Sequence, residues 1–183
     1  MSDLMLVECC APTLAGLKTG SLFACPYTDR EELKAQIRRC NRCLHAAGLA
    51  LIALRWTERQ ALLYLFRPKA LQRDLLGQDA GEILARAGYE SRDCVACLLH
   101  LMRRLRSKGD FPHEIGLFLS YPPEDVKGFI ENSAKNYKCI GTWKVYGDEA
   151  GARKTFSKYK KCTDSYCRRV EAGTPLHALA VAI

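Results

Sequence analysis

Cysteine and histidine are the side chains of this sequence that could perform nucleophilic or redox chemistry. Cys10 stands two residues before Pro12, a residue that favours the first turn of a helix. A thiol just before a helix N-terminus feels the positive end of the helix dipole, which lowers its pKa and raises its reactivity. Thr13, Lys18 and Thr19 follow closely and could bind a ligand beside this thiol. The alternative is a buried cysteine next to an ordinary proline-initiated turn.

The neighbouring pair His113–Glu114 could complete such a site. A histidine can serve as general base for a cysteine, and a carboxylate can orient the imidazole. We therefore predict a catalytic set of Cys10, His113 and Glu114, and no metal, because a mononuclear metal site needs three or four ligands. The sequence identifies no cofactor, since it has neither a GxGxxG nor a Walker A motif. The alternative is a surface histidine that caps backbone groups.

Aromatic and basic side chains further along the chain could add ligand contacts. The predicted contacts are Tyr121, Trp143, Lys144 and Tyr146, all at the ends of expected strands. A strand over 115–121 would hold His113 and Tyr121 roughly 20 Å apart, at about 3.3 Å per residue. Cys10 can therefore meet only one of these two ends, and we predict the His113 end.

Two CxxC pairs resemble zinc-ligand spacings. They are Cys40 with Cys43 and Cys94 with Cys97, and each pair falls within an expected helix rather than in a glycine-containing knuckle. Core packing is therefore the preferred interpretation. The ten cysteines of the chain lie mostly in apolar segments, which favours free thiols in a reducing cytoplasm.

A basic segment near the C-terminus could bind an acidic partner or RNA. On a helix over 148–170, Phe156, Tyr159 and Tyr166 share the buried stripe, and the charged side chains face solvent. The predicted basic face consists of Arg153, Lys154, Lys158, Lys161 and Arg168. No RNA-binding motif accompanies it, so the alternative is an ordinary solvated helix face.

Length and composition predict one domain over residues 1–183. The chain is 48% hydrophobic with a formal charge of +8, and its longest apolar runs are too short to cross a bilayer. The first ten residues lack the basic start of a signal peptide. We therefore expect a cytoplasmic protein without a membrane partner.

Periodicity predicts an α/β or α+β fold, with a single mixed sheet of about six strands and helices on both faces. The capping box that begins at Thr28 starts one helix, and Gly48 ends it. The expected strands are 21–25, 49–55, 61–66, 115–121, 139–146 and 176–183, and the other expected helices are 3–10, 12–20, 68–76, 79–87, 92–107, 122–130 and 148–170.

Four stretches of the chain resemble a bacterial family, domain of unknown function 3793, found mostly in anaerobic Gram-positive bacteria. They are CAPTLAGLKTGSLF (10–23), FPHEIGLFLSYPPEDVKGFI (111–130), WKVYGD (143–148) and YKKCT (159–163). The family pattern has glycine at the position of Ser120. The resemblance implies a cytosolic bacterial protein linked to iron and flavodoxin physiology, and it implies no established activity.

Together these features lead to two functional hypotheses. The first is thiol-dependent redox chemistry or small-ligand handling, with a small molecule or a redox protein as partner. The second is a non-enzymatic protein that binds an acidic partner or RNA through its basic helix face.

Overall fold

The computed structural model describes residues 1–107 and 109–183. The chain divides into two compact units, the first formed by 1–69 with 159–183 and the second by 70–158. The single domain expected from the sequence stays a prediction, and each unit is described by itself.

The first unit is built on a three-stranded antiparallel sheet. Its strands are β1 (Gly20–Pro26), β2 (Ala50–Trp56) and β3 (Gln60–Phe66), with β3 in the middle. β2 and β3 form the hairpin that the short polar link between them predicts. Thr57 stabilises this turn, because its hydroxyl accepts the Gln60 N–H at 3.2 Å.

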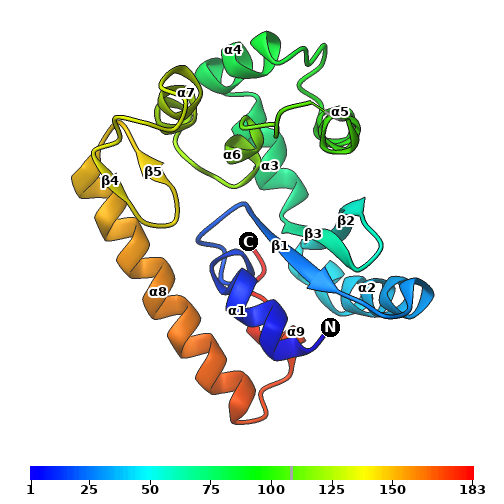
Figure 1. The fold of residues 1–183 in the computed structure, drawn as a ribbon. Helices are drawn as coiled ribbons and strands as arrows, with labels where there is room; N and C mark the ends of the chain where they lie inside the picture. Colours follow the sequence, from blue (N-terminus) through cyan, green and yellow to red (C-terminus); the bar gives the residue numbers. More distant parts are fainter. Residues whose placement is uncertain (108) are drawn as a thin grey trace. The chain divides into compact units, whose positions relative to one another are not determined.

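Helices cover one face of this sheet (Figure 1). They are α1 (Asp3–Leu14), α2 (Arg30–Leu44) and α9 (Leu176–Leu179), with the short 3-10 helix η1 (His45–Ala47) after α2. α2 begins where its sequence predicts, since Asp29 accepts hydrogen bonds from the Glu31 and Glu32 amides. Alternate strand residues, such as Leu51 and Leu63, enter the apolar core between the sheet and these helices.

Arg67 joins several chain segments at the edge of this core. Its side chain, which belongs to a residue only 3% exposed, donates hydrogen bonds to the carbonyls of Thr13, Leu14, Ala47 and Val181 at 2.7–3.0 Å. Within the described residues Arg67 makes no ion pair. The guanidinium is therefore satisfied by backbone carbonyls, which ties α1, η1 and the C-terminal segment together.

The second unit is mainly helical. Its elements are α4 (Gln78–Arg86), α5 (Cys94–Arg106), α6 (Ile115–Phe118), α7 (Pro123–Glu131), β4 (Cys139–Ile140) and β5 (Lys144–Val145). Two helices, α3 (Pro68–Leu75) and α8 (Glu149–Glu171), run from one unit into the other. β4 and β5 pair as a small antiparallel hairpin.

Asp125 links α7 to this hairpin. The residue is 2% exposed, and its carboxylate accepts hydrogen bonds from Trp143 Nε1 at 2.6 Å and from the amides of Tyr146 and Gly147 at 2.7 and 2.8 Å. Both carboxylate oxygens are thus used. The Tyr121 ring stacks on Trp143 at 4.9 Å, which adds apolar contact to the same junction.

The single six-stranded sheet predicted from the sequence is wrong, although the mixed content of helix and strand is confirmed. Residues 115–118 form α6 rather than a strand, and 176–179 form α9. The expected strand over 139–146 is the β4–β5 hairpin. Short apolar runs cannot be assigned by periodicity alone, because a buried helical turn and a covered strand give the same pattern.

The chain reverses directly after α6. Ser120 adopts a left-handed conformation with φ of 58°, and the Tyr121 N–H then donates to the Gly116 carbonyl at 3.0 Å. The predicted separation of roughly 20 Å between His113 and Tyr121 assumed an extended chain and therefore has no basis. Glycine adopts this left-handed conformation at low cost, whereas serine does not.

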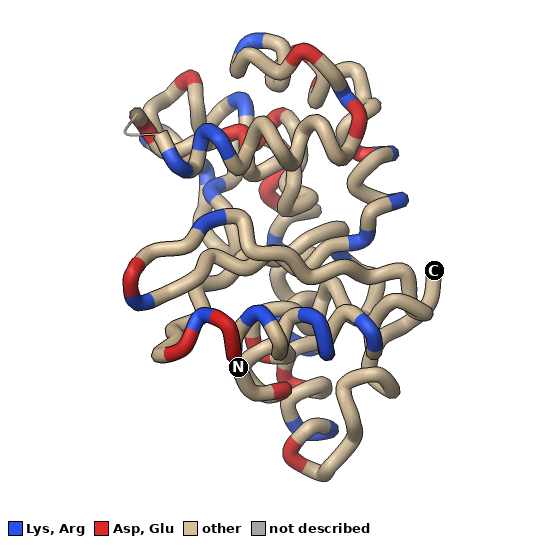
Figure 2. The backbone as a smooth tube through the Cα atoms, turned by 90° about the vertical axis from the view of Figure 1, so that its right-hand side faces the viewer, with Lys and Arg blue, Asp and Glu red and all other residues tan. Residues whose placement is uncertain are grey.

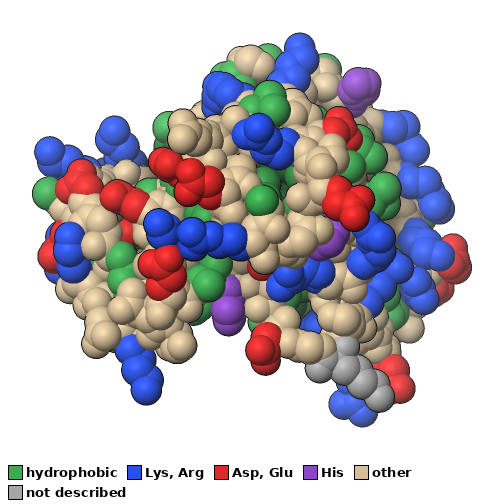
Figure 3. All heavy atoms as spheres, turned by 90° about the horizontal axis from the view of Figure 1, so that it is seen from above, with side chains coloured by type: hydrophobic (Ala, Val, Ile, Leu, Met, Phe, Trp, Pro, Cys, Tyr) green, Lys and Arg blue, Asp and Glu red, His purple; other side chains and the backbone are tan. Residues whose placement is uncertain are grey.

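No described helix combines the length and apolar character that crossing a bilayer requires. Charge differs between the units, because the first carries 14 Lys and Arg against eight Asp and Glu, and the second carries 14 against 12. Basic residues occur along many elements of the chain (Figure 2). On the face shown in Figure 3 they lie among acidic and exposed hydrophobic side chains.

Candidate ligand-binding site

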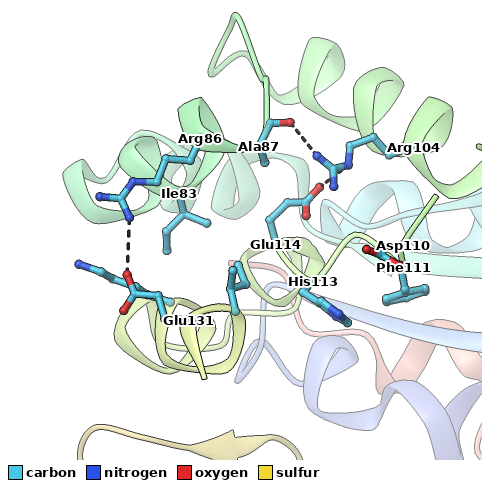
Figure 4. A pocket seen from close by; sticks show the side chains of 11 residues that line it. Ile83, Arg86, Ala87, Arg104, Asp110, Phe111, His113, Glu114 and Glu131 are labelled. Atoms are coloured by element: carbon cyan, nitrogen blue, oxygen red, sulfur yellow. Dashed lines mark hydrogen bonds and ion pairs between the residues drawn. The ribbon is translucent and has the colours of Figure 1, made fainter. Parts of the chain in front are cut away.

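A pocket of about 270 Å³ lies within the second unit (Figure 4). Its lining comes from α4, α5, α7 and the loop that leads into α6. The lining residues are Ile83, Arg86, Ala87, Arg104, Asp110, Phe111, His113, Glu114, Lys127, Ile130 and Glu131. This volume is slightly below the about 300–1,000 Å³ typical of small-molecule sites, so the pocket suits a small ligand.

Glu114 is the most deeply buried charged residue of this pocket. Its side chain is 3% exposed, Oε1 accepts the Tyr89 hydroxyl at 3.0 Å, and the same oxygen forms an ion pair with Arg104 Nε at 3.1 Å. Arg104 is held in turn by the Ala87 carbonyl, to which Nη1 donates at 2.7 Å (Figure 4). Burial, with the adjacent Glu114 carboxylate, raises the pKa of Tyr89, so the phenol stays protonated and continues to donate.

His113 lies at the same pocket but does not pair with Glu114. The histidine is exposed, and its ring packs edge-on against Phe129 at 4.9 Å and near Phe111 at 6.0 Å. Glu114 points instead to Tyr89 and Arg104. The predicted role of Glu114 as the group that orients His113 is therefore corrected, because neighbouring positions in the sequence place the two side chains in different surroundings.

Cys10 lies in the first unit, in the C-terminal half of α1. Pro12 is inside this helix rather than at the start of a second one, so the expected favourable dipole position is wrong. Cys10 is fully buried, and burial raises the pKa of its thiol, with Cys9 adding to the effect against Lys18 and Ser21. The thiol is therefore protonated and inaccessible in this conformation.

The side chains predicted to assist Cys10 have structural contacts. Thr13 and Ser21 share a buried hydrogen bond of 2.8 Å, which joins α1 to β1. The Thr19 carbonyl accepts the Arg67 N–H at 2.9 Å. Burial lowers the pKa of Lys18 to about 8, and the nearby Cys10 partly opposes this shift. None of these residues lines one of the described pockets.

The predicted ligand contacts Tyr121, Trp143, Lys144 and Tyr146 gather at the α7–hairpin junction instead. Lys144 Nζ donates to the Ala134 carbonyl at 2.8 Å and lies over the Tyr137 ring. Trp143 and the Tyr146 amide are bound by Asp125. None of the four lines the pocket that contains Glu114.

The five side chains of the predicted basic face are exposed on α8. Arg153 pairs with Glu149 at 2.7 Å one helical turn away. The predicted apolar stripe is at least half-buried: Phe156 meets the Trp143 ring at 4.6 Å, and the Tyr159 hydroxyl donates to the Leu17 carbonyl at 3.4 Å. The expected orientation of this helix is thus the one observed.

Both CxxC pairs lie on helices, Cys40 and Cys43 on α2 and Cys94 and Cys97 on α5. Among residues 1–107 and 109–183, no three Cys, His, Asp or Glu side chains come together in a way that could hold a metal ion. Core packing of Cys94 and Cys97 agrees with their burial.

Sequence reasoning missed Tyr89 and Arg104. One signal was present, since a glutamate that leads into a fully apolar run is expected to be buried and so to need a basic partner. Sixteen arginines and twelve lysines were available as that partner, and only the fold selects Arg104.

A family model described as "Protein of unknown function (DUF3793)" matches residues 6–180. Neither the curated proteins nor the solved structures contain a significant match to the chain. The matched range includes every residue that lines the pocket. The chain belongs to this family of proteins of unknown function, DUF3793.

Proposed function

We propose that the protein binds a small organic molecule in the pocket of the second unit. Glu114 carries this proposal, because a charged side chain only 3% exposed forms part of the wall of an open cavity. A buried ion pair stabilises a fold little better than apolar residues of the same size would. A buried titratable group in a concave, partly apolar pocket is instead typical of a binding site.

Small-ligand handling is the part of the first hypothesis that this geometry supports. Thiol-dependent redox chemistry would need Cys10 as an exposed thiolate, and burial opposes both conditions. A link to iron or flavodoxin physiology stays a prediction from the family resemblance. All ten cysteines are free, which agrees with a reducing compartment and supports the proposed cytoplasmic location.

A screen of small organic fragments by protein-observed NMR tests the proposal. Binding fragments should shift the amide signals of residues around Glu114, His113 and Ile130. Ile130→Trp should fill the pocket and weaken these fragments about tenfold or more, because Ile130 lines the cavity. Val95→Trp is the matched control, since Val95 is also an exposed apolar residue on a helix of this unit but does not line the pocket.

Two results would contradict the proposal. One is a screen in which fragments shift signals only outside the pocket or shift none. The other is an equal loss of binding in Ile130→Trp and Val95→Trp, which would show that the site lies elsewhere.

A second candidate function is recognition of an acidic partner or RNA by α8. Lys154, Lys158, Lys161 and Arg168 are exposed and form no ion pair with described residues, which leaves their charges available. Binding to heparin or RNA should then weaken steeply as salt rises. A Lys154→Gln, Lys158→Gln variant should reduce that salt dependence, whereas a matched Arg38→Gln, Arg39→Gln variant of α2 should not.

A further inference from the structure

The two arginines that line the pocket already have acidic partners in the protein. Glu114 pairs with Arg104 through Oε1, and Glu131 pairs with Arg86 at 3.5 Å. Arg104 is further occupied by the Ala87 carbonyl. Both arginines that line the pocket are thus already engaged by acceptors of the protein.

One carboxylate oxygen of Glu114 has no donor. Tyr89 and Arg104 both bind Oε1, and Oε2 receives no hydrogen bond from the described residues. Oε2 is not fully enclosed by the protein, and Glu114 lines the cavity. An oxygen of a carboxylate that is only 3% exposed and that no protein group donates to is poorly solvated, and a ligand donor would stabilise it.

A second acceptor lies on the same pocket. Asp110 is exposed and forms no ion pair within the described part of the chain. Glu114 and Asp110 therefore both offer acceptors to whatever occupies the cavity.

The surrounding helices favour positive charge as well. Arg86 and Ala87 stand at the C-terminal end of α4, Arg104 is in the last turn of α5, and Ile130 and Glu131 are in the last turn of α7. The C-terminal end of a helix carries partial negative charge. Three such ends at one pocket stabilise a cation there.

Lys127 is the remaining cation of the lining, and its position does not cancel this preference. It is exposed on α7 and also lines an adjoining pocket whose acidic residues are Asp79, Glu82 and Glu124. These three carboxylates compete with Glu114 and Asp110 for the charge of Lys127, which forms no ion pair within the described residues.

We infer that the ligand is a small primary amine with an apolar body, whose ammonium group binds Glu114 Oε2; this rests on the proposed function. Asp110 accepts a second hydrogen bond from the ammonium group. The apolar body contacts Ile83, Phe111 and Ile130, which form the hydrophobic part of the lining. A charge-assisted hydrogen bond to a desolvated carboxylate gives selectivity against neutral and anionic molecules of the same shape.

Three compounds with one branched apolar body test this inference: 3-methylbutylamine, 3-methylbutanol and 4-methylpentanoate. NMR titration of the pocket amides should show that the amine binds about tenfold or more tightly than the alcohol, and that the carboxylate binds most weakly. Glu114→Gln should remove this preference for the amine and leave the affinity for the alcohol nearly unchanged. Glu90→Gln is the matched control, since Glu90 is an exposed glutamate of the same unit that does not line this pocket.

Asp110→Asn provides a second variant that does not depend on the buried pair. Because Asp110 is exposed, the fold should be unaffected, and amine affinity should fall about threefold. Equal affinity for amine and alcohol, preference for the carboxylate, or an unchanged amine affinity in Glu114→Gln would overturn the inference. If these neutral or anionic compounds bind in the pocket, the proposed function survives without the inference; if no fragment and no member of the series binds there, both fail.

Discussion

Arg67 in the first unit and Glu114 in the second are both charged and almost fully buried, yet their surroundings differ. Arg67 donates to four backbone carbonyls and borders none of the described pockets. Glu114 has two donors on one oxygen, none on the other, and faces a cavity. Asp125 resembles Arg67, because three donors satisfy both of its oxygens.

This difference separates two uses of a buried charge. A fully satisfied group such as Arg67 or Asp125 fixes chain segments in place, and its removal should cost stability. An incompletely satisfied group beside a cavity, such as Glu114, contributes less to the fold and leaves binding capacity for a ligand. Substitutions at these three positions test the distinction directly.

The largest loss of stability is expected from Arg67→Leu. Four carbonyls would lose the guanidinium donor at once, although those of Thr13 and Leu14 keep a backbone N–H donor, and we expect the free energy of unfolding to fall by about 3 kcal/mol. Guanidinium chloride unfolding followed by circular dichroism measures this change. Arg59→Leu is the control, since Arg59 is exposed, and it should change stability by less than about 0.5 kcal/mol. A loss below about 1 kcal/mol for Arg67→Leu would contradict the structural role of this side chain.

Asp125→Asn should have the second largest effect. The asparagine oxygen can still accept the Tyr146 and Gly147 amides, but its NH₂ group would face the Trp143 indole N–H. Two opposed donors should cost about 2 kcal/mol. Tryptophan fluorescence during unfolding of a Trp56→Phe background, in which Trp143 is the remaining tryptophan, reports on this junction, and exposed Glu124→Gln is the neighbouring control. If Asp125→Asn unfolds like the unmodified protein, the hydrogen bonds to both carboxylate oxygens of Asp125 do not stabilise the fold.

Glu114→Gln should destabilise the protein less than Asp125→Asn. The glutamine oxygen can keep both existing donors, Tyr89 and Arg104, so only the charge is lost, and we expect a cost of about 1 kcal/mol. Thermal unfolding compared with that of Tyr89→Phe, which removes one donor and retains the charge, measures the separate contributions. A loss as large as that of Asp125→Asn would place Glu114 with the structural charges and remove the contrast.

Lys18 provides a pH test of buried charge in the first unit. Its pKa is lowered to about 8 from 10.5, so between pH 8 and 9 the unfolded chain binds more protons at this site than the folded chain. Stability from this group therefore rises with pH in that window, by less than about 1 kcal/mol. The raised pKa of Cys10 acts in the opposite direction as the unfolded thiol begins to ionise near its ordinary pKa of 9.0, and this contribution is common to both proteins compared below. Lys18→Met should abolish the rise between pH 8 and 9, and parallel curves for the two proteins would refute the shift.

The sequence predicts some of the elements around Arg67, Glu114 and Asp125, but not the partners of these buried charges. Local patterns located α2, the β2–β3 hairpin and the exposed face of α8, because caps, polar links and a 3.6-residue period act within one segment. Glu114 was singled out, but its partner was not, since Tyr89 and Arg104 lie on other segments that only tertiary packing brings together. The same limit applies to Asp125, whose three donors all follow it by 18 residues or more.

The segment after Glu114 shows why its strand prediction failed. Ile115, Leu117 and Phe118 are all buried, so apolarity alone fits a strand covered on both faces. The helical turn packs closely against α7, and only glycine fits at position 116. A Cβ there would lie 2.7 Å from the Val126 side chain and 3.1 Å from the Tyr121 ring. Such an approach between α6 and α7 depends on atoms distant in sequence, which periodicity does not report.

The smallest expected effect concerns the residue that ends this turn. Ser120 holds φ of 58°, a conformation that costs a non-glycine residue about 1–2 kcal/mol. Ser120→Gly removes that cost but adds backbone entropy to the unfolded chain, so we expect a net gain of about 0.5 kcal/mol. Ser120→Val should instead lose more than about 1 kcal/mol, because a branched side chain tolerates this region poorly. Equal stability of the two variants, measured by thermal unfolding, would mean that the left-handed turn does not persist in solution. If Ser120→Gly is more stable and binds amines as the unmodified protein does, the chain reversal after α6 can be stabilised without affecting the Glu114 pocket.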